Sequence, residues 1–221
     1  MATSLLARVR DSAPRRYDLG IRLLTAGRLD GAYDRLVGGI RRDDRVLDLG
    51  CGTGALTLRA ARRGGVVRAL AGNHAMLEIA AARVRDAGLA TRVELAALET
   101  AQLAEEPTGA YDVVTVGLCL YNLGNDVLSE ALPELRRMLR PGGLLLAADR
   151  IRPRNRLGRS LHSLARAPLL VLARSLTWRL PAPVDALPER LTAAGFQLEE
   201  VRRSRLGGFA TYVARRPLEV A

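Results

Sequence analysis

The chain has 221 residues, 48% of them hydrophobic, which is enough to bury the core of one α/β domain and excludes a disordered chain. Its formal net charge of +11 comes from 34 basic residues, all arginine, against 23 acidic ones, and it favours anionic partners such as membrane surfaces or acidic proteins. Aromatic residues make up only 4%, which is little material for stacking on bases, so we do not expect a nucleic-acid partner.

The predicted elements in the first two thirds of the chain alternate between strands and helices. Residues 17–40 have the helical spacing of apolar side chains. Beyond them the sequence predicts strands at 45–50, 66–71, 92–97, 111–120 and 144–149, and helices at 55–63, 75–88 and 127–140. Pro133 should start or kink the last of these helices, and Pro141-Gly142-Gly143 predicts a turn. This alternation indicates a parallel, doubly wound sheet with helices on both faces.

The end of the chain has a different pattern. Residues 186–196 predict a helix, and two strand-like runs on either side of Gly207-Gly208 predict an antiparallel hairpin. The expected fold class is α/β, a Rossmann-like, doubly wound sheet of seven strands, mostly parallel, with a C-terminal antiparallel hairpin. No repeat or linker interrupts the sequence, so we expect residues 1–221 to form a single domain, with residues 1–40 as an N-terminal helical cover.

A glycine-rich loop, DLGCGTG at residues 48–54, runs directly from the first predicted strand into a helix. Its three glycines leave no Cβ between the backbone and a ligand, and the helix N-terminus offers unpaired N–H groups to it. The same letters satisfy the GxGxxA pattern of a dinucleotide fold. Asp48, two residues before the first glycine, suits a cationic amino-acid ligand better than a pyrophosphate.

With this loop the sequence resembles the class I S-adenosylmethionine-dependent methyltransferases over roughly residues 40–150. VLDLGCGTG is similar to the family's first motif, and NHAMLEIA to the run after its second strand. YDVVTVGLCLYNL is similar to the fourth-strand motif, and LRRMLRPGGLLLAAD to the following helix, turn and fifth strand. The nearest group comprises the ubiquinone and menaquinone C-methylation enzymes, and the opening of the chain is similar to a bacterial subset found with corrinoid proteins.

The resemblance implies S-adenosylmethionine as the cofactor and methyl transfer by in-line displacement to a small, hydrophobic acceptor. It implies that Asp48 and the glycines hold the amino-acid part of the cofactor, that Glu99 and Thr100 lie beside the adenine, and that Tyr17 closes over it. The predicted cofactor-binding residues are Tyr17, Asp48, Gly50, Cys51, Gly52, Thr53, Gly54, Ala71, Gly72, Asn73, Met76, Glu99, Thr100 and Gly117. We expect Cys51 to be a packing residue, not a nucleophile.

Ala71 departs from the family pattern. In relatives an acid at this position accepts hydrogen bonds from both ribose hydroxyls, a charged interaction of about 1.5–3 kcal/mol, and alanine accepts none. Three interpretations stay open. The chain binds S-adenosylmethionine less tightly, with help from Asn73 or the backbone; it is a methyltransferase-like binding protein that docks an acidic partner or a membrane; or it uses another nucleotide. Arg68 could pair with the 2′-phosphate of NADPH, which keeps this nucleotide as an alternative, whereas Asp48 argues against NADPH binding.

The candidate catalytic residues on the acceptor side follow the fourth and fifth predicted strands, because ligands bind outside the carboxyl ends of such strands. Cys119, Tyr121 and Asn122 come just past the fourth strand, and Asp149 ends the fifth. Packing or helix capping accounts for each of them as well as catalysis does. Displacement at a sulfonium requires mainly alignment of the reacting groups, so no metal is expected.

Residues 150–185 form a basic amphipathic insert where related enzymes place their substrate cover. Eight arginines and no acid occur between residues 150 and 184, among apolar side chains with helical spacing. The insert predicts either an ordinary helical lid or, through residues 150–180, contact with a membrane surface or a greasy acceptor. The predicted partner is a small-molecule acceptor, lipophilic or corrinoid-linked.

The sequence also bears on location. Cys51 and Cys119 are in no CxxC pair and build no metal-ligand cluster with His74 and His162. The opening of the chain lacks the apolar core of a signal peptide, and no apolar run of about 18 residues could span a bilayer. The expected location is cytoplasmic, including the inner face of the membrane if the insert binds lipid.

Overall fold

A seven-stranded sheet organises the molecule. The computed structural model describes residues 14–25, 27–97, 100–120, 125–151, 186–204 and 208–218. The strands are β1 (Arg45–Leu49), β2 (Val66–Ala71), β3 (Val93–Ala97), β4 (Tyr111–Gly117), β5 (Leu139–Arg150), β6 (Gln197–Arg203) and β7 (Phe209–Arg215). Their order is β3-β2-β1-β4-β5-β7-β6, with β1 to β5 parallel and β7 antiparallel to both of its neighbours. The predicted fold class is confirmed.

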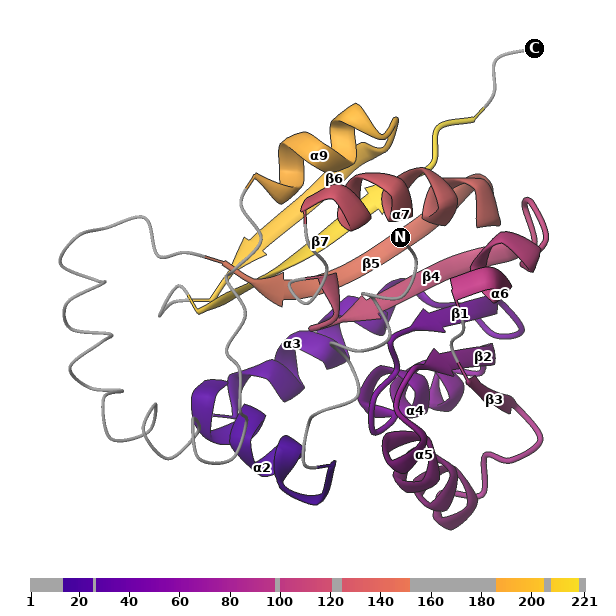
Figure 1. Cartoon of the computed structure of the whole chain (residues 1–221), viewed down its shortest axis with the longest axis vertical. Coiled ribbons are helices and arrows are strands. Elements are labelled where there is room, and N and C mark those ends of the chain that lie inside the picture. The colour runs from indigo at the N-terminus through magenta and orange to yellow at the C-terminus, as the bar shows by residue number, and fades with distance from the viewer. Residues whose placement is uncertain are drawn as a thin grey trace, which may run out of the picture.

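Helices cover the two faces of the sheet (Figure 1). They are α2 (Pro14–Thr25), α3 (Arg28–Leu36), the 3-10 helix η1 (Val37–Gly39), α4 (Ala55–Arg62), α5 (His74–Asp86), α6 (Thr100–Glu105), α7 (Asn125–Met138) and α9 (Leu187–Ala193). Leucines of α7 and α9 pack in one core cluster with Leu47 of β1, whereas residues of α3 and α4 pack in a second cluster with Val46. Neighbouring residues of β1 therefore point into different layers, as the strand period of two requires.

The chain departs from the sequence prediction where backbone geometry interrupts a regular pattern. The helix expected at 17–40 divides into α2, α3 and η1. The break between α2 and α3 arises because Gly27 adopts a left-handed conformation with φ +69° and its N–H donates to the carbonyl of Arg22. The strand expected at 111–120 ends at Gly117, because Leu118 has φ +50°, which extended chain cannot adopt.

Two proline-containing segments also differ from expectation. Pro133 lies inside α7, which continues through it. The predicted Pro141-Gly142-Gly143 turn bulges from within β5: Tyr111 pairs with Leu139, and the next paired residues are Val113 and Leu144. The sequence predicted a turn at these three residues, but β5 runs through them, and Gly142, with φ +77°, lies within the register shift. The pairing of Leu139 and the six-residue helix α6 were also missed.

Among the described helices, none combines the length and apolar character that crossing a bilayer requires.

Candidate functional site

The glycine loop lies where the strand order reverses. The chain passes from β1 outward to β2 and β3, then returns to place β4 on the other side of β1. In open α/β sheets, ligands bind outside the carboxyl ends of the strands at such a switch point. The loop follows the carboxyl end of β1 directly, and the N–H groups of Gly50 and Cys51 both donate to the carbonyl of Leu70 on β2, at 2.8 and 2.9 Å.

The glycines of the site have different roles. A Cβ at Gly50 would clash with the side chain of Cys119, and one at Gly117 would lie 2.8 Å from both Leu56 Cδ1 and Tyr33 Oη. Close packing therefore requires both glycines. A Cβ at Gly52 would have only Met76 Sδ, at 3.8 Å, and the carbonyl oxygen of Gly50, at 4.0 Å, within 4 Å. Of these three glycines, Gly52 therefore has the most open space on its Cβ side.

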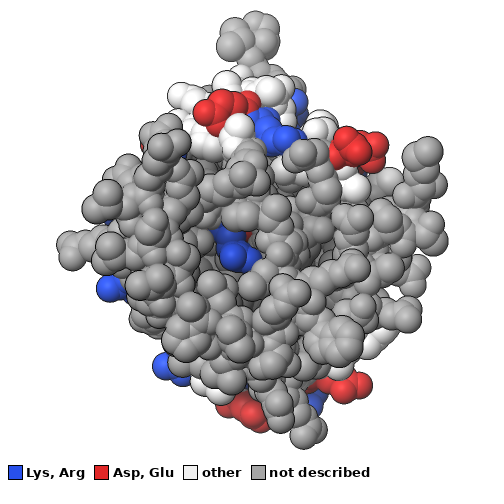
Figure 2. Space-filling view, turned by 60° about the vertical axis from the view of Figure 1, so that its left-hand side comes forward, with Lys and Arg blue, Asp and Glu red and all other residues white. Residues whose placement is uncertain are grey.

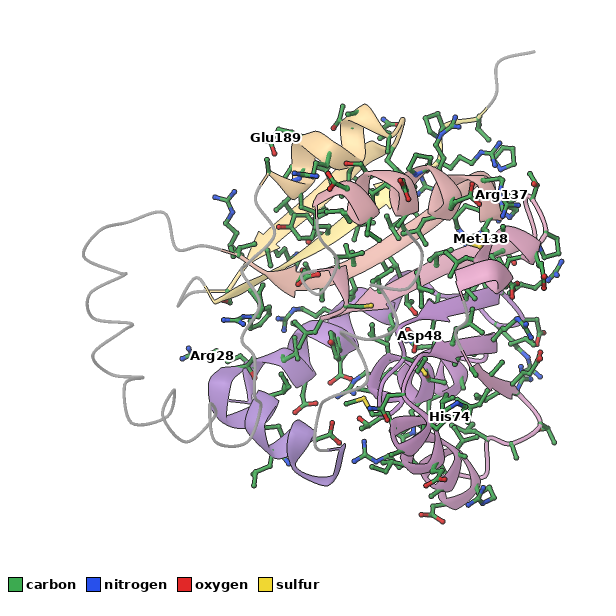
Figure 3. All side chains as sticks on the ribbon, in the orientation of Figure 1. Arg28, Asp48, His74, Arg137, Met138 and Glu189 are labelled. Atoms are coloured by element: carbon green, nitrogen blue, oxygen red, sulfur yellow. The ribbon has the colours of Figure 1, made fainter. Side chains whose placement is uncertain are left out.

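Asp48 is fully buried at the end of β1, near the centre of the molecule (Figure 3). Its two carboxylate oxygens accept hydrogen bonds from the hydroxyls of Thr57, at 2.5 Å, and Thr115, at 2.8 Å. Burial raises the pKa of Asp48 to about 6, although these hydrogen bonds oppose the rise. In this conformation both carboxylate oxygens of Asp48 are engaged by threonine hydroxyls. The two threonines were not predicted, since neither belongs to the loop motif.

Ala71 is the last residue of β2 and is buried. Asn73, the neighbour expected to help in its place, is the N-cap of α5: its Oδ1 accepts the backbone N–H of Met76 at 3.1 Å. This cap engages the same oxygen that a ribose hydroxyl would need, so the help expected from Asn73 is reduced. His74, labelled in Figure 3, begins the helix directly after it.

Arg68 does not support the NADPH interpretation. Its Nε donates to Glu106 Oε1 at 2.8 Å, and its Nη1 donates to Glu94 on β3. The hydroxyl of Tyr111 also donates to Glu106, which is buried. Two carboxylates therefore hold this guanidinium, and a 2′-phosphate would have to displace them.

The cover helix α2 reaches the glycine loop through Asp18, which the sequence did not single out. Asp18 Oδ1 accepts the hydroxyl hydrogen of Thr53 at 2.7 Å, and Asp18 Oδ2 accepts a hydrogen bond from Arg83 on α5. No motif signalled this contact, because the three residues come from distant segments.

Among the residues expected on the acceptor side, Asp149 is buried in β5 and accepts the backbone N–H of Arg150 at 2.6 Å. The register pairs Asp149 with Ala210 and Ala147 with Tyr212, so Asp149 and Tyr212 are diagonal neighbours on one face. Burial raises the pKa of the Tyr212 phenol to about 12, and the charge of Asp149 adds to this effect. Tyr212 was not predicted, since only strand pairing brings it to Asp149.

Neither cysteine is an activated thiol. Burial, and then the charge of Asp48, hold the pKa of Cys51 well above its usual value. Burial raises the pKa of Cys119 to about 12, with the charges of Asp149 and Asp48 adding to it. A raised pKa leaves little thiolate at neutral pH, so these residues serve packing.

Known proteins with similar sequences match the central part of the chain. The protein family described as "Methyltransferase domain" matches residues 46–143. The ubiquinone/menaquinone biosynthesis C-methyltransferase UbiE of Azotobacter vinelandii (strain DJ) is 34% identical over 157 residues, which cover 69% of this chain and 61% of that enzyme. The chain carries a class I methyltransferase domain. It spans about three fifths of the length of the curated relatives it matches.

Solved structures show the same fold as this methyltransferase domain. The [4+2]-cyclase SpnF has a TM-score of 0.66 at 20% identity, over 86% of this chain and 82% of that one. A SAM-dependent methyltransferase from Aquifex aeolicus has a TM-score of 0.59 at 19% identity, over 88% and 92%. At such identities the likeness concerns the fold alone.

Several predicted site residues of the methyltransferase domain are not among those the structure describes. They are Glu99, Tyr121, Asn122, the side chains of Tyr17 and Thr100, and residues 152–185 of the insert. Among the predicted cofactor-binding residues, the structure gathers the loop, Ala71, Asn73 and Met76 at the carboxyl ends of β1 and β2, above the buried Asp48. Asp149 lies in β5, one residue beyond the pair of Ala148 and Gly117 at which β4 ends.

Proposed function

We propose that this chain transfers a methyl group from S-adenosylmethionine to a small, hydrophobic acceptor by in-line displacement. The observation that carries the proposal is the buried carboxylate of Asp48 directly beneath a glycine loop at the switch point of the sheet. A cation in the amino-acid part of the cofactor is favoured above this charge, since little water intervenes to screen it.

The residues present fit the cofactor. Gly52 leaves its side of the loop open to a ligand, and α4 begins directly after Gly54. The first N–H groups of α4 have no partner within the helix, and that of Thr57 donates to Asp48. When bound, S-adenosylmethionine supplies a methyl group on a sulfonium, whose sulfide is already a good leaving group. The chain then has to orient the acceptor and, for an acceptor that must lose a proton, to receive that proton.

Asp149 is the described residue best placed to receive a proton. It lies near the carboxyl end of β5, on the acceptor side, with the phenol of Tyr212 diagonally beside it. Tyr121 and Asn122 remain candidates by sequence, because they follow β4, the strand next to β5.

A lipophilic acceptor is supported by the UbiE relatives, whose name refers to ubiquinone and menaquinone biosynthesis, and by the basic, apolar sequence of residues 150–180. A corrinoid-linked acceptor is the other candidate. On the face shown in Figure 2, described side chains of both signs are visible, so membrane contact is supported by the sequence of the insert alone. Co-sedimentation with anionic and neutral vesicles tests it, and equal recovery with both would remove the membrane from the proposal.

The second candidate function is that of a methyltransferase-like binding protein with weakened cofactor binding. Ala71 and the capping role of Asn73 favour it, since neither side chain offers the ribose a free carboxylate. The fold permits it, as SpnF carries the same fold and is described as a [4+2]-cyclase.

Calorimetric titration with S-adenosylmethionine and with NADPH separates the candidates. We expect the native protein to bind S-adenosylmethionine and not NADPH, and to release S-adenosylhomocysteine when incubated with cell extract. If the native protein takes up neither ligand while Ala71→Asp takes up S-adenosylmethionine, the binding-protein function replaces the enzyme. Mass spectrometry of extract components that gain a methyl group then identifies the acceptor.

A further inference from the structure

We propose that Asp18 is a positioning residue that couples closure of the cover helix α2 to the conformation of the glycine loop, and thereby to cofactor affinity. The inference rests on the proposed function, because it concerns the same site. It adds a residue that no part of the loop motif contains.

Three side chains and one carbonyl form a closed ring of hydrogen bonds. The Thr53 hydroxyl donates to Asp18 Oδ1 at 2.7 Å, and Arg83 Nη2 donates to Asp18 Oδ2. Arg83 Nη1 completes the ring by donating to the backbone carbonyl of Thr53 at 3.1 Å. The ring thus joins α2, the glycine loop and α5, which are far apart in the sequence.

The ring holds the part of the loop that has the most freedom. Thr53 is buried and lies between Gly52, with φ +55°, and Gly54, with φ +84°. The two flanking glycines lose more conformational entropy on ordering than other residues would, so this stretch of backbone is costly to fix. Because the ring engages both the hydroxyl and the carbonyl of Thr53, it selects one orientation of this peptide, next to the open side of Gly52.

The value of the ring lies in positioning more than in overall stability. The side chains of Asp18 and Arg83 are 33% and 41% exposed, and ion pairs at such exposure add little to folding. Hydrogen bonds to ionised groups are nevertheless directional and stronger than neutral ones. Removing the charge should therefore loosen the loop and α2 while the fold persists.

Coupling of this kind is reciprocal. If a closed α2 favours the loop conformation that binds the cofactor, the cofactor must favour a closed α2 to the same extent. Since Ala71 supplies no carboxylate to a ribose, a larger share of the affinity depends on this preorganisation of the loop.

The test compares Asp18→Asn with the matched variant Asp34→Asn. Asp34 belongs to the neighbouring cover helix α3, and its Oδ1 accepts from Arg59 Nε on α4 at 2.6 Å, so it forms an ion pair of the cover that does not include the loop. We expect Asp18→Asn to weaken binding of S-adenosylhomocysteine about tenfold, the usual scale of one charged hydrogen bond, and Asp34→Asn to change it less than about twofold. Asp18→Glu, which keeps the charge, should recover part of the loss.

Hydrogen exchange supplies a readout that a merely structural residue would not change. In the native protein, S-adenosylhomocysteine should protect residues 14–25 together with residues 52–54, and in Asp18→Asn it should protect the loop without α2. Native-like affinity and joint protection in Asp18→Asn would overturn the proposal. Circular dichroism of each variant verifies that a loss is not due to unfolding.

The outcome also distinguishes this inference from the proposed function. If the native protein binds no S-adenosylhomocysteine, the proposed cofactor is wrong. Hydrogen exchange in the ligand-free protein then tests whether the ring couples α2 to the loop. Faster exchange at residues 52–54 in Asp18→Asn than in Asp34→Asn supports the coupling of α2 to the loop, and equal exchange rates refute it.

Discussion

Replacing Ala71 with aspartate should restore the interaction that this site lacks. The new carboxylate would stand at the end of β2, beside the loop, where it can accept hydrogen bonds from ribose hydroxyls. Such charged hydrogen bonds contribute about 1.5–3 kcal/mol, which alone would raise affinity roughly ten- to a hundredfold.

Burial reduces this gain. Ala71 is only 2% exposed, and the neighbouring buried carboxyl of Asp48 shows what burial does here, since its pKa is raised to about 6. The introduced group should also have a raised pKa, so part of the binding energy offsets its desolvation. We therefore expect a net gain of about tenfold for S-adenosylmethionine near pH 8, equivalent to about 1.4 kcal/mol, and a smaller gain at lower pH.

Calorimetric titration of the native protein, Ala71→Asp and Ala71→Asn measures this effect. Ala71→Asn has nearly the same size without the charge, so it controls for filling the space beside the loop. The ligand-free Ala71→Asp variant should melt earlier than the native protein, because it buries a carboxylate whose partner is absent. Equal affinities for Ala71→Asp and Ala71→Asn would refute the reasoning, since the charge would then have no effect on the ligand.

Three further predictions concern the buried charges and the glycines. Affinity for S-adenosylmethionine should rise with pH through about 6 as Asp48 ionises. The raised pKa of Asp48 also means that its contribution to folding stability falls as the pH rises from about 4 to 6. Asp48→Asn should bind the cofactor more weakly and lose both pH dependences, and an unchanged pH profile in that variant would assign them to another group. Asp149→Asn should slow methyl transfer about 10²- to 10⁴-fold and leave S-adenosylhomocysteine affinity within about twofold, as measured by turnover and calorimetry, whereas an unchanged rate would remove Asp149 as the proton acceptor. Gly117→Ala should lower the free energy of unfolding by about 1–3 kcal/mol, because its Cβ meets Leu56 Cδ1 and Tyr33 Oη at 2.8 Å. Gly52→Ala should also lower the free energy of unfolding, because φ +55° strains an L residue, and it should in addition weaken cofactor binding. Chemical denaturation and titration of both variants measure these effects, and an unchanged cofactor affinity in Gly52→Ala would contradict the second.

The order of the elements followed from short stretches of sequence. Gly64-Gly65 and Gly88 mark helix ends, and the glycine loop after an apolar strand marks the first turn of the site, because turns and helix ends depend on neighbouring residues. Boundaries were less certain where backbone geometry changed within an apolar run. The strand that ends at Gly117 shows this, since the sequence VGLCL gives no indication that Leu118 adopts a left-handed conformation.

The roles of individual polar residues were harder to predict. Arg68 has the charge that a 2′-phosphate would need, but Glu94 on β3 and Glu106 after α6 hold its guanidinium. Asn73 has the hydrogen-bonding groups that a ribose would need, but its oxygen caps α5. In both cases a protein group competes with the ligand for the same polar side chain. The sequence motif does not reveal which protein group that is.

The sequence by itself determined the alternation of strands and helices, the loop of residues 48–54, the C-terminal hairpin and the loss of an acid at Ala71, because each depends on local spacing or on one residue type. Only the tertiary structure decided which residues meet. It places Thr115 against Asp48, Tyr212 beside Asp149 and Asp18 on the loop, in pairs that are 67, 63 and 35 residues apart. The physical reason is that hydrogen bonds and charge interactions act over a few ångströms, and only strand register and helix packing bring such distant residues within that range.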